Sequence, residues 1–133
     1  MESPEVRRRT MQAVKGKDTV PELMVRSLTH RMGYRFRLHR KDLPGKPDLV
    51  FPGRRKAIFV HGCFWHGHDC ARGARVPKSN RDYWTKKIAR NKERDLAACA
   101  ALTHSGWTYL ILWECNLGNE KGLKARVRKF LNS

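Results

Sequence analysis

The sequence has few acidic residues: 12 Asp and Glu stand against 29 Lys and Arg, which leaves a formal net charge of +17. Self-repulsion among so many like charges opposes compaction, so an excess of this size indicates a polyanionic partner. Nucleic acid is the leading class of polyanion for a chain of this composition. The shortage of acidic residues therefore favours a nucleic-acid-binding protein.

Long apolar segments, internal repeats and low-complexity tracts are also lacking. Because no run is long enough to span a bilayer and no basic helix has a clean apolar face, we expect no membrane partner. No secretory signal opens the chain, and the four cysteines are interleaved with histidines, which is not the pattern of a disulfide framework. We therefore expect the protein in the cytoplasm of a prokaryote or in a similarly reducing compartment.

A chain of 133 residues holds one domain with a real core and leaves little room for a second. We expect residues 19–133 to form that domain, as a monomer, behind a basic arm at residues 1–18. Two interpretations of the arm remain open. It is a solvated segment when no ligand is present, or it folds onto nucleic acid while Met11 and Val14 wedge against bases.

Apolar periodicity and turn residues predict an α/β domain with a mixed central sheet flanked by helices. The expected helices span residues 19–32, 80–104 and 120–131, and the first has an apolar stripe of Met24, Val25, Leu28 and Met32. The expected strands span residues 34–39, 48–51, 56–61 and 107–113. The second and third strands should form an antiparallel hairpin. The last strand is the most apolar and should be central, reached by a crossover from the long helix.

The stretch AIFVHGCFWHGHDC, residues 57–70, joins a strand pattern to a segment rich in metal-binding side chains. Cys63, His68 and Cys70 can converge on one ion, and thiolates with imidazole suit zinc. Cys115 follows the last strand and is the expected fourth ligand, although His66 could replace His68 on spacing alone. Cys99 lies among alanines on the long helix and is expected to be a core thiol.

Three further side chains predict a hydrolytic site. Asp48 opens an apolar strand across a hairpin from His61, which favours a metal-binding carboxylate. Asp95 lies in the apolar stripe of the long helix and needs His61 or a cation as a partner, unless that stripe opens to solvent. Glu22 is either a helix-capping residue, three positions after Thr19, or a catalytic one. Carboxylates that bind Mg²⁺ and a histidine that moves protons together indicate metal-assisted phosphodiester hydrolysis.

Four segments carry a resemblance to one known family: TVPELMVRSLTHRMGYRFRLHRKDLPGKPDLVF, AIFVHGCFWHGHDC, NRDYWTKKIARNKERD and GWTYLILWEC. They are similar to the very-short-patch-repair (Vsr) DNA mismatch endonucleases, and the similarity extends from Arg9 to about Leu117. The resemblance implies a restriction-endonuclease-like fold with a structural Zn²⁺ and a catalytic Mg²⁺. The implied reaction is nicking of double-stranded DNA 5′ of the thymine in T:G mismatches, which arise when 5-methylcytosine deaminates.

The resemblance also implies roles for individual residues. Asp48 and the carbonyl of Val60 would bind Mg²⁺. His61, as general base, and His66 would flank the scissile phosphate, so that His68 becomes the zinc ligand. Glu22 and Asp95 would assist catalysis. The expected DNA contacts are Phe64, Trp65, Trp84, Met11, Val14 and Asn91, with the aromatic rings as a wedge between bases.

One departure from the wider restriction-type superfamily concerns the second hairpin strand. An acid and a lysine stand there in the superfamily, whereas this chain has Phe59 and His61. The superfamily's lysine role is therefore not transferred to any residue here.

Two other classes of function remain open. One is a zinc-stabilised, non-catalytic nucleic-acid-binding module, which the charge alone would favour. The other is a homing endonuclease of the EDxHD type, which shares the pattern of Glu22, Asp48, His61 and Asp95. The short chain, without appended DNA-binding modules, argues against the homing enzyme. Mismatch-repair proteins are candidate partners besides DNA.

Overall fold

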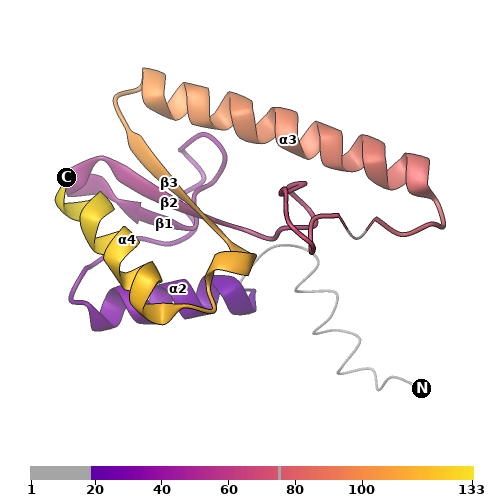
Figure 1. Cartoon of the computed structure of the whole chain (residues 1–133). Coiled ribbons are helices and arrows are strands. Elements are labelled where there is room, and N and C mark those ends of the chain that lie inside the picture. The colour runs from indigo at the N-terminus through magenta and orange to yellow at the C-terminus, as the bar shows by residue number, and fades with distance from the viewer. Residues whose placement is uncertain (1–18, 75) are drawn as a thin grey trace, which may run out of the picture.

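The computed structural model describes residues 19–74 and 76–133 (Figure 1). The expected basic arm, with Met11 and Val14, therefore lies outside the described residues. The elements are α2 (Val20–Arg31), β1 (Leu49–Phe51), β2 (Lys56–His61), α3 (Arg81–His104), β3 (Thr108–Trp113) and α4 (Glu120–Asn132), with short 3₁₀ helices at Pro52–Arg54 and Glu114–Asn116. The α/β class and the three predicted helices are confirmed. None of the helices in the described ranges is long and apolar enough to cross a membrane.

The described sheet has the order β1-β2-β3, with β1 antiparallel and β3 parallel to β2. The predicted hairpin is therefore confirmed, and so is the crossover through α3. The prediction that residues 107–113 form the central strand is wrong, because β2 is the strand paired on both edges. β3 is nonetheless apolar along its length, since Leu110 and Leu112 pack into one core while Tyr109 and Ile111 pack into the other.

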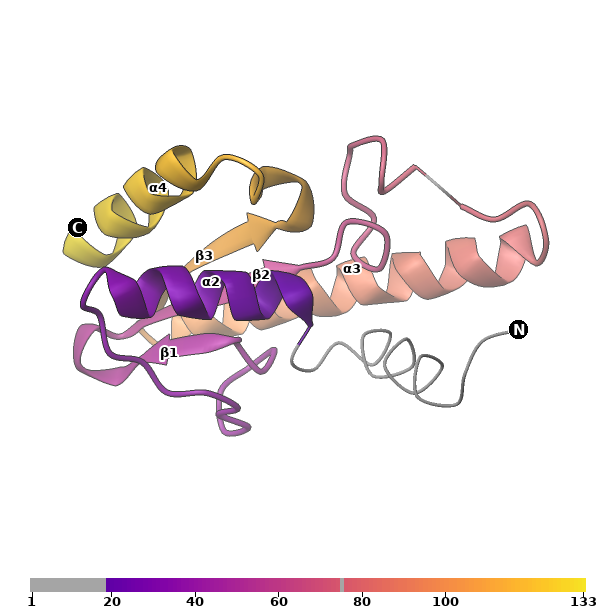
Figure 2. The ribbon, with the colours of Figure 1, turned by 90° about the horizontal axis from the view of Figure 1, so that it is seen from below.

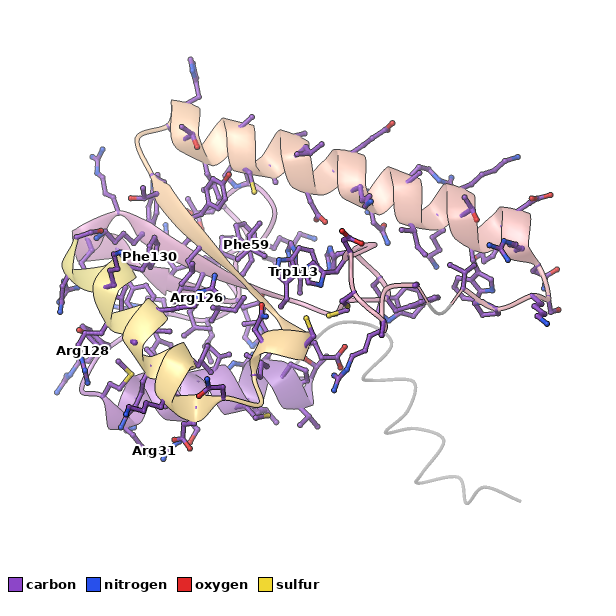
Figure 3. All side chains as sticks on the ribbon, in the orientation of Figure 1. Arg31, Phe59, Trp113, Arg126, Arg128 and Phe130 are labelled. Atoms are coloured by element: carbon purple, nitrogen blue, oxygen red, sulfur yellow. The ribbon has the colours of Figure 1, made fainter. Side chains whose placement is uncertain are left out.

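Helices cover both faces of the sheet, as Figure 1 and the rotated view in Figure 2 show. α2 and α4 lie on one face, and α3 lies on the other. The larger core joins Val25, Leu28, Leu123, Val127 and Leu131 to the sheet. The smaller core joins Cys99 and Leu102 of α3 to Phe59. Cys99 is thus buried, as expected of a core thiol. Figure 3 labels Arg126 and Arg128, two exposed residues of α4.

The first helix begins as its sequence predicts. Thr19 Oγ1 accepts a hydrogen bond from the backbone amide of Glu22, and Met32 forms the C-cap before Gly33, whose φ is +91°. The predicted apolar stripe is only partly buried: Val25 and Leu28 are in the core, whereas Met24 remains 46% exposed. Met24 directly precedes Val25 in the chain, and successive residues of a helix point in different directions. The side chain of Met24 therefore points away from the core when that of Val25 points into it.

The prediction of a strand at residues 34–39 is wrong. Only an isolated antiparallel bridge joins Arg37 to Val50. Tyr34 and Phe36 still pack against the larger core, so the alternation correctly indicated which side chains face inward. One bridge cannot extend into a ladder here, because His39, with φ of +56°, turns the chain away.

Candidate active site and metal centre

Four side chains that could hold a metal ion gather where β2 and β3 end. Cys63, His68, Cys70 and Cys115 each offer one ligand atom, and these atoms all lie within 4.8 Å of one another. We call these four residues the Cys/His group. In the parallel register of β2 and β3, His61 lies opposite Trp113, and each strand reaches its cysteine two residues later. The strand register therefore joins two ligands that are far apart in the chain.

Backbone amides orient the thiols of the Cys/His group. The amide of Cys115 donates to Cys63 Sγ at 3.4 Å, and the amide of Gly73 donates to Cys70 Sγ at 3.4 Å. The Gly73 bond is the main cause that lowers the pKa of Cys70 to about 6, whereas burial raises the pKa of Cys63 to about 12. A thiolate at Cys63 therefore needs a cation beside it. Three thiols and an imidazole form a donor set that fits tetrahedral zinc.

The loop that carries Cys70 folds back tightly at Gly73. A Cβ atom at this position would clash with the carbonyl oxygen of His68, so a side chain cannot be accommodated without moving the loop. Glycine therefore lets the chain pass over His68 and present its amide to Cys70.

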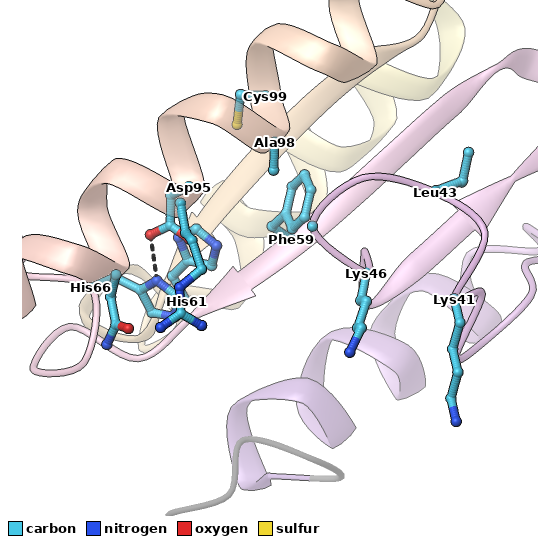
Figure 4. Close-up of a pocket in the computed structure, with 12 residues that line it drawn as sticks. Lys41, Leu43, Lys46, Phe59, His61, His66, Asp95, Ala98 and Cys99 are labelled. Atoms are coloured by element: carbon cyan, nitrogen blue, oxygen red, sulfur yellow. Dashed lines mark hydrogen bonds and ion pairs between the residues drawn. The ribbon is translucent and has the colours of Figure 1, made fainter. Parts of the chain in front are cut away.

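Two histidines lie face to face beside this group (Figure 4). The ring of His61, at the end of β2, stacks on the ring of His66 with centroids 3.7 Å apart and planes 3° apart. His66 Nδ1 lies 2.6 Å from Asp95 Oδ2 on α3. Of the expected partners of Asp95, His61 or a cation, His61 is not the one that forms the pair, because the turn closed by the amide of His66 and the carbonyl of Gly62 brings His66 to α3. The cation alternative stays a prediction.

His61 is almost fully buried, at 6% exposed, and its Nδ1 has no hydrogen-bond partner among the described residues. Burial, followed by the neighbouring His66, lowers the pKa of His61 to about 4, against the opposing effect of Asp95. The ring is therefore neutral at pH 7 and keeps a lone pair that can accept a proton or bind a polar group.

Two carboxylates lie at the other side of the same cleft. Asp48 Oδ2 accepts a hydrogen bond of 2.6 Å from the amide of Val60, and burial raises the pKa of Asp48 to about 7, with a further contribution from Glu22. Glu22 is itself buried and accepts a hydrogen bond of 3.1 Å from Arg26. Neighbouring carboxylates that disfavour each other's charge are stabilised by a dication, and oxygen ligands suit Mg²⁺.

The carboxylates and the histidines line one cavity of about 770 Å³. We call it the cleft, and its titratable lining consists of Glu22, Asp48, His61, His66, Lys46, Lys87, Asp95 and Glu114. These side chains come from α2, from both hairpin strands or their ends, from α3 and from the end of β3. The sheet and the helices on its two faces therefore meet at this point.

The aromatic residues expected to touch DNA form a cluster at the wall of the cleft. The rings of Phe64, Trp65 and Trp84 contact one another edge to face, with centroids 5.0 to 5.6 Å apart, and each is partly exposed. Lys87 lies over the Trp65 ring at 5.4 Å. Asn91 donates a hydrogen bond of 2.9 Å to the carbonyl of Trp65, so it holds the backbone of the aromatic loop.

Two residues of the site escaped the sequence analysis. Trp113 stacks on His68 at 4.1 Å and meets the His61 ring edge-on at 5.1 Å, so it lies between the Cys/His group and the cleft (Figure 3). Glu114 accepts a hydrogen bond from the amide of Cys63 at 3.4 Å and pairs with Arg72 at 3.5 Å. Both directly precede the predicted ligand Cys115, and that proximity was the available signal.

Comparison with known proteins gives consistent matches. A family model described as DNA mismatch endonuclease Vsr matches residues 1–72. The type II nicking enzyme V.XorIIP of Xanthomonas oryzae pv. oryzae is 56% identical over 98% of this chain and 95% of its own length. V.NmeAIP of Neisseria meningitidis is 38% identical over 91% of this chain and 86% of its own length. The DNA mismatch endonuclease Vsr of Escherichia coli is 42% identical over 86% of this chain and 74% of its own length.

Proposed function

The chain belongs to the Vsr family of DNA mismatch endonucleases, and from this membership we propose that it nicks double-stranded DNA 5′ of the thymine in T:G mismatches. Such mismatches arise when 5-methylcytosine deaminates, and the nick would initiate very short patch repair. We further propose that the reaction depends on Mg²⁺, that residues 19–133 form one domain of restriction-endonuclease-like fold, and that the enzyme acts as a cytoplasmic monomer.

One observation carries the proposal: the buried Glu22, the half-buried Asp48 and a stacked histidine pair line the same cleft. Carboxylates alone would indicate a cation site, and histidines alone would indicate proton transfer. Phosphodiester hydrolysis requires both, since a dianionic transition state must be stabilised while a water molecule loses a proton. The aromatic cluster at the wall of the cleft adds a surface on which bases can stack.

Asp48 and the carbonyl of Val60 would hold Mg²⁺, with Glu22 beside them. When bound, the ion would supply positive charge against the scissile phosphate and promote ionisation of water. The raised pKa of Asp48 supports a cation site here, because a neighbouring dication favours the charged carboxylate that burial disfavours. The hydrogen bond from the Val60 amide keeps the Asp48 carboxylate turned toward β2.

His61 would take the proton from the attacking water. Its lowered pKa leaves the ring neutral, as a base requires. His66 would donate to the phosphate from the opposite side of the stack. The Asp95 carboxylate, 2.6 Å from His66 Nδ1, accepts from Nδ1–H and fixes the orientation of that ring. His66 would then donate from Nε2 in its doubly protonated, imidazolium form, which the Asp95 carboxylate stabilises.

Selection of T:G over T:A would come from the aromatic cluster. Insertion of a ring into a base step unstacks it at a cost of about a few kcal/mol, and a mispair reduces that cost. Trp65 is well placed for this role, because the Cys/His group flanks its loop and Asn91 fixes its backbone. The zinc would therefore act structurally, by keeping the aromatic loop rigid beside the histidines.

A pair of labelled duplexes tests the proposal. A duplex with one T:G mispair and its T:A twin are incubated with Mg²⁺, and the cleaved strand is mapped at nucleotide resolution. We expect one nick 5′ of the mispaired thymine and none in the twin. Asp48→Ala should bind the T:G duplex nearly as wild type does and fail to nick it. Equal nicking of both duplexes, or nicking by Asp48→Ala at the wild-type rate, would contradict the assignment.

A further inference from the structure

The cleft has an excess of acidic side chains although the chain as a whole is strongly basic. Glu22, Asp48, Asp95 and Glu114 all line it, and a DNA phosphate would bring further negative charge. Among the described lining residues, the lysines and arginines are only Lys46 and Lys87. A cleft that binds a phosphodiester next to four carboxylates needs these cations to offset the repulsion between substrate and protein.

Lys87 is already engaged by the aromatic cluster. Its Nζ lies over the rings of Trp65, Tyr83 and Trp84 at 5.4, 5.8 and 5.9 Å. Lys46, in contrast, is exposed, and its ammonium has no ion pair or side-chain hydrogen bond within the parts of the chain that the structure describes. Lys46 is therefore the cation of the cleft that remains available to a ligand.

The backbone around Lys46 is held in an unusual conformation. Gly45 and Lys46 both have positive φ values, +76° and +50°. A Cβ atom on Gly45 would lie 2.7 Å from Cβ of Ala98 and 3.1 Å from the Phe59 ring, so the loop is packed closely against α3 and β2. The left-handed conformation suits glycine or asparagine better than lysine. The fold therefore fixes the position of residue 46 but gives no reason for a lysine there.

Lys46 also stands where two cavities meet. It lines the cleft and a neighbouring cavity of about 480 Å³, and both contain His61, His66 and Asp95. Figure 4 shows Lys46 on the loop across from the His66–Asp95 pair. Asp48 follows two residues later, after the fully buried Pro47. The rigid loop therefore presents one cation to the space between the carboxylate side and the histidine side of the cleft.

From this placement we propose that Lys46 binds a phosphate of the cleaved DNA strand, at the scissile position or next to it, and so contributes directly to nicking. The proposal rests on the proposed nuclease function of the cleft. An ammonium donor to a phosphate oxygen forms a charge-assisted hydrogen bond and strengthens as charge develops in the transition state.

Lys46→Gly is the decisive variant, because glycine keeps the left-handed backbone while the whole side chain, with its ammonium, is removed. Its melting temperature should equal or exceed that of wild type. Its nicking rate on saturating T:G duplex should fall about tenfold to a hundredfold, and Lys46→Arg should restore most of the rate. Lys41→Ala is the matched control. It removes an exposed charge that lines the neighbouring cavity and not the cleft, so it should change the rate less than about threefold.

A backbone-neutralised substrate locates the contact. Duplexes with a methylphosphonate at single positions around the scissile bond are bound to wild type and to Lys46→Gly. At the contacted position, the methylphosphonate should weaken DNA binding by wild type and leave DNA binding by Lys46→Gly unchanged. The logarithm of the DNA-binding constant should also fall less steeply with the logarithm of the salt concentration in Lys46→Gly, by an amount that corresponds to about one phosphate contact. Equal sensitivity of both proteins at every position, or an unimpaired Lys46→Gly, overturns the proposal.

Binding and nicking separate the two hypotheses. If wild type nicks no duplex, the proposed function fails, and the binding measurements still decide whether Lys46 contacts a phosphate. If wild type nicks T:G duplex and Lys46→Gly matches it in rate and salt slope, only the role of Lys46 is wrong.

Discussion

The Cys/His group and the cleft adjoin each other at the ends of β2 and β3, yet their metal-binding side chains are held in different ways. In the Cys/His group, the ligand atoms converge within 4.8 Å, and the buried Cys63 thiol has a pKa raised to about 12. In the cleft, the carboxylates that could bind a metal already have protein partners. Asp48 accepts a hydrogen bond from the Val60 amide, and Asp95 pairs with His66. The first arrangement presents four side chains that could hold one ion, whereas in the second the carboxylates already pair with protein groups. This contrast fits a structural zinc beside a dication that binds with the substrate.

The largest effect should follow from damage to the Cys/His group. Cys115→Ala removes one ligand, so zinc should be lost and the free energy of unfolding should fall by on the order of 5 kcal/mol or more. Elemental analysis and thermal melting measure both quantities. Cys99→Ala is the control: it should retain zinc and lose only about 1–2 kcal/mol of packing. Loss of zinc in Cys99→Ala but not in Cys115→Ala would overturn the ligand set.

Damage to the histidines of the cleft should affect the rate and spare the fold. His61→Ala should slow nicking about 10²–10⁴-fold, because a general base contributes a factor of that size. Asp95→Asn should slow it less, since it misorients His66 without removing a ring. Single-turnover kinetics on T:G duplex give the rates, with exposed His30→Ala as the control. If His61→Ala lost nicking only to the extent that its lower melting temperature left the protein unfolded in the assay, His61 would have a structural role alone.

Removal of charge from the cleft should stabilise the protein, opposite to removal of a ligand from the Cys/His group. The pKa of Asp48 is raised to about 7 from 3.8, so the folded state holds this proton more tightly than the unfolded state. Ionisation of Asp48 therefore lowers stability as pH rises from about 4 to 7, by up to about 4 kcal/mol at pH 8. Without Mg²⁺, Asp48→Asn should melt higher than wild type at pH 8 and about equally at pH 4. A constant difference across this range would contradict the shifted pKa.

Substitution in the aromatic cluster should have the smallest effect, and it should affect the discrimination between T:G and T:A duplexes. Trp65→Ala should lower the ratio of T:G to T:A binding about tenfold, because stacking of one base is worth about 1–3 kcal/mol. Trp107→Ala is the matched control, since Trp107 packs in the smaller core. It should melt lower and keep the ratio of wild type. The reverse result, with discrimination intact in Trp65→Ala, would make Trp65 a core residue only.

Local pattern was sufficient for much of this protein. The α2 cap at Thr19, the hairpin of β1 and β2 and the helix at residues 120–131 follow from spacing and turn residues, and the structure has them. The motif of residues 57–70 also pointed to three side chains of the Cys/His group, with His66 left open as an alternative to His68, and Cys115 was expected from its place after the last strand. Their role as zinc ligands stays a prediction, as do the roles of Asp48, His61 and Glu22.

Sequence by itself determined the family, the positions of the helices and the residues that could bind metal, because these depend on local periodicity and on motifs. The tertiary structure alone decided that β2 is the central strand, that Asp95 pairs with His66, and that Lys46 lies at the meeting point of two cavities. Each of these outcomes depends on how α3 packs across the sheet onto a loop and a turn distant in the chain. Contacts of that kind are fixed by shape and close packing, which spacing along the sequence does not encode.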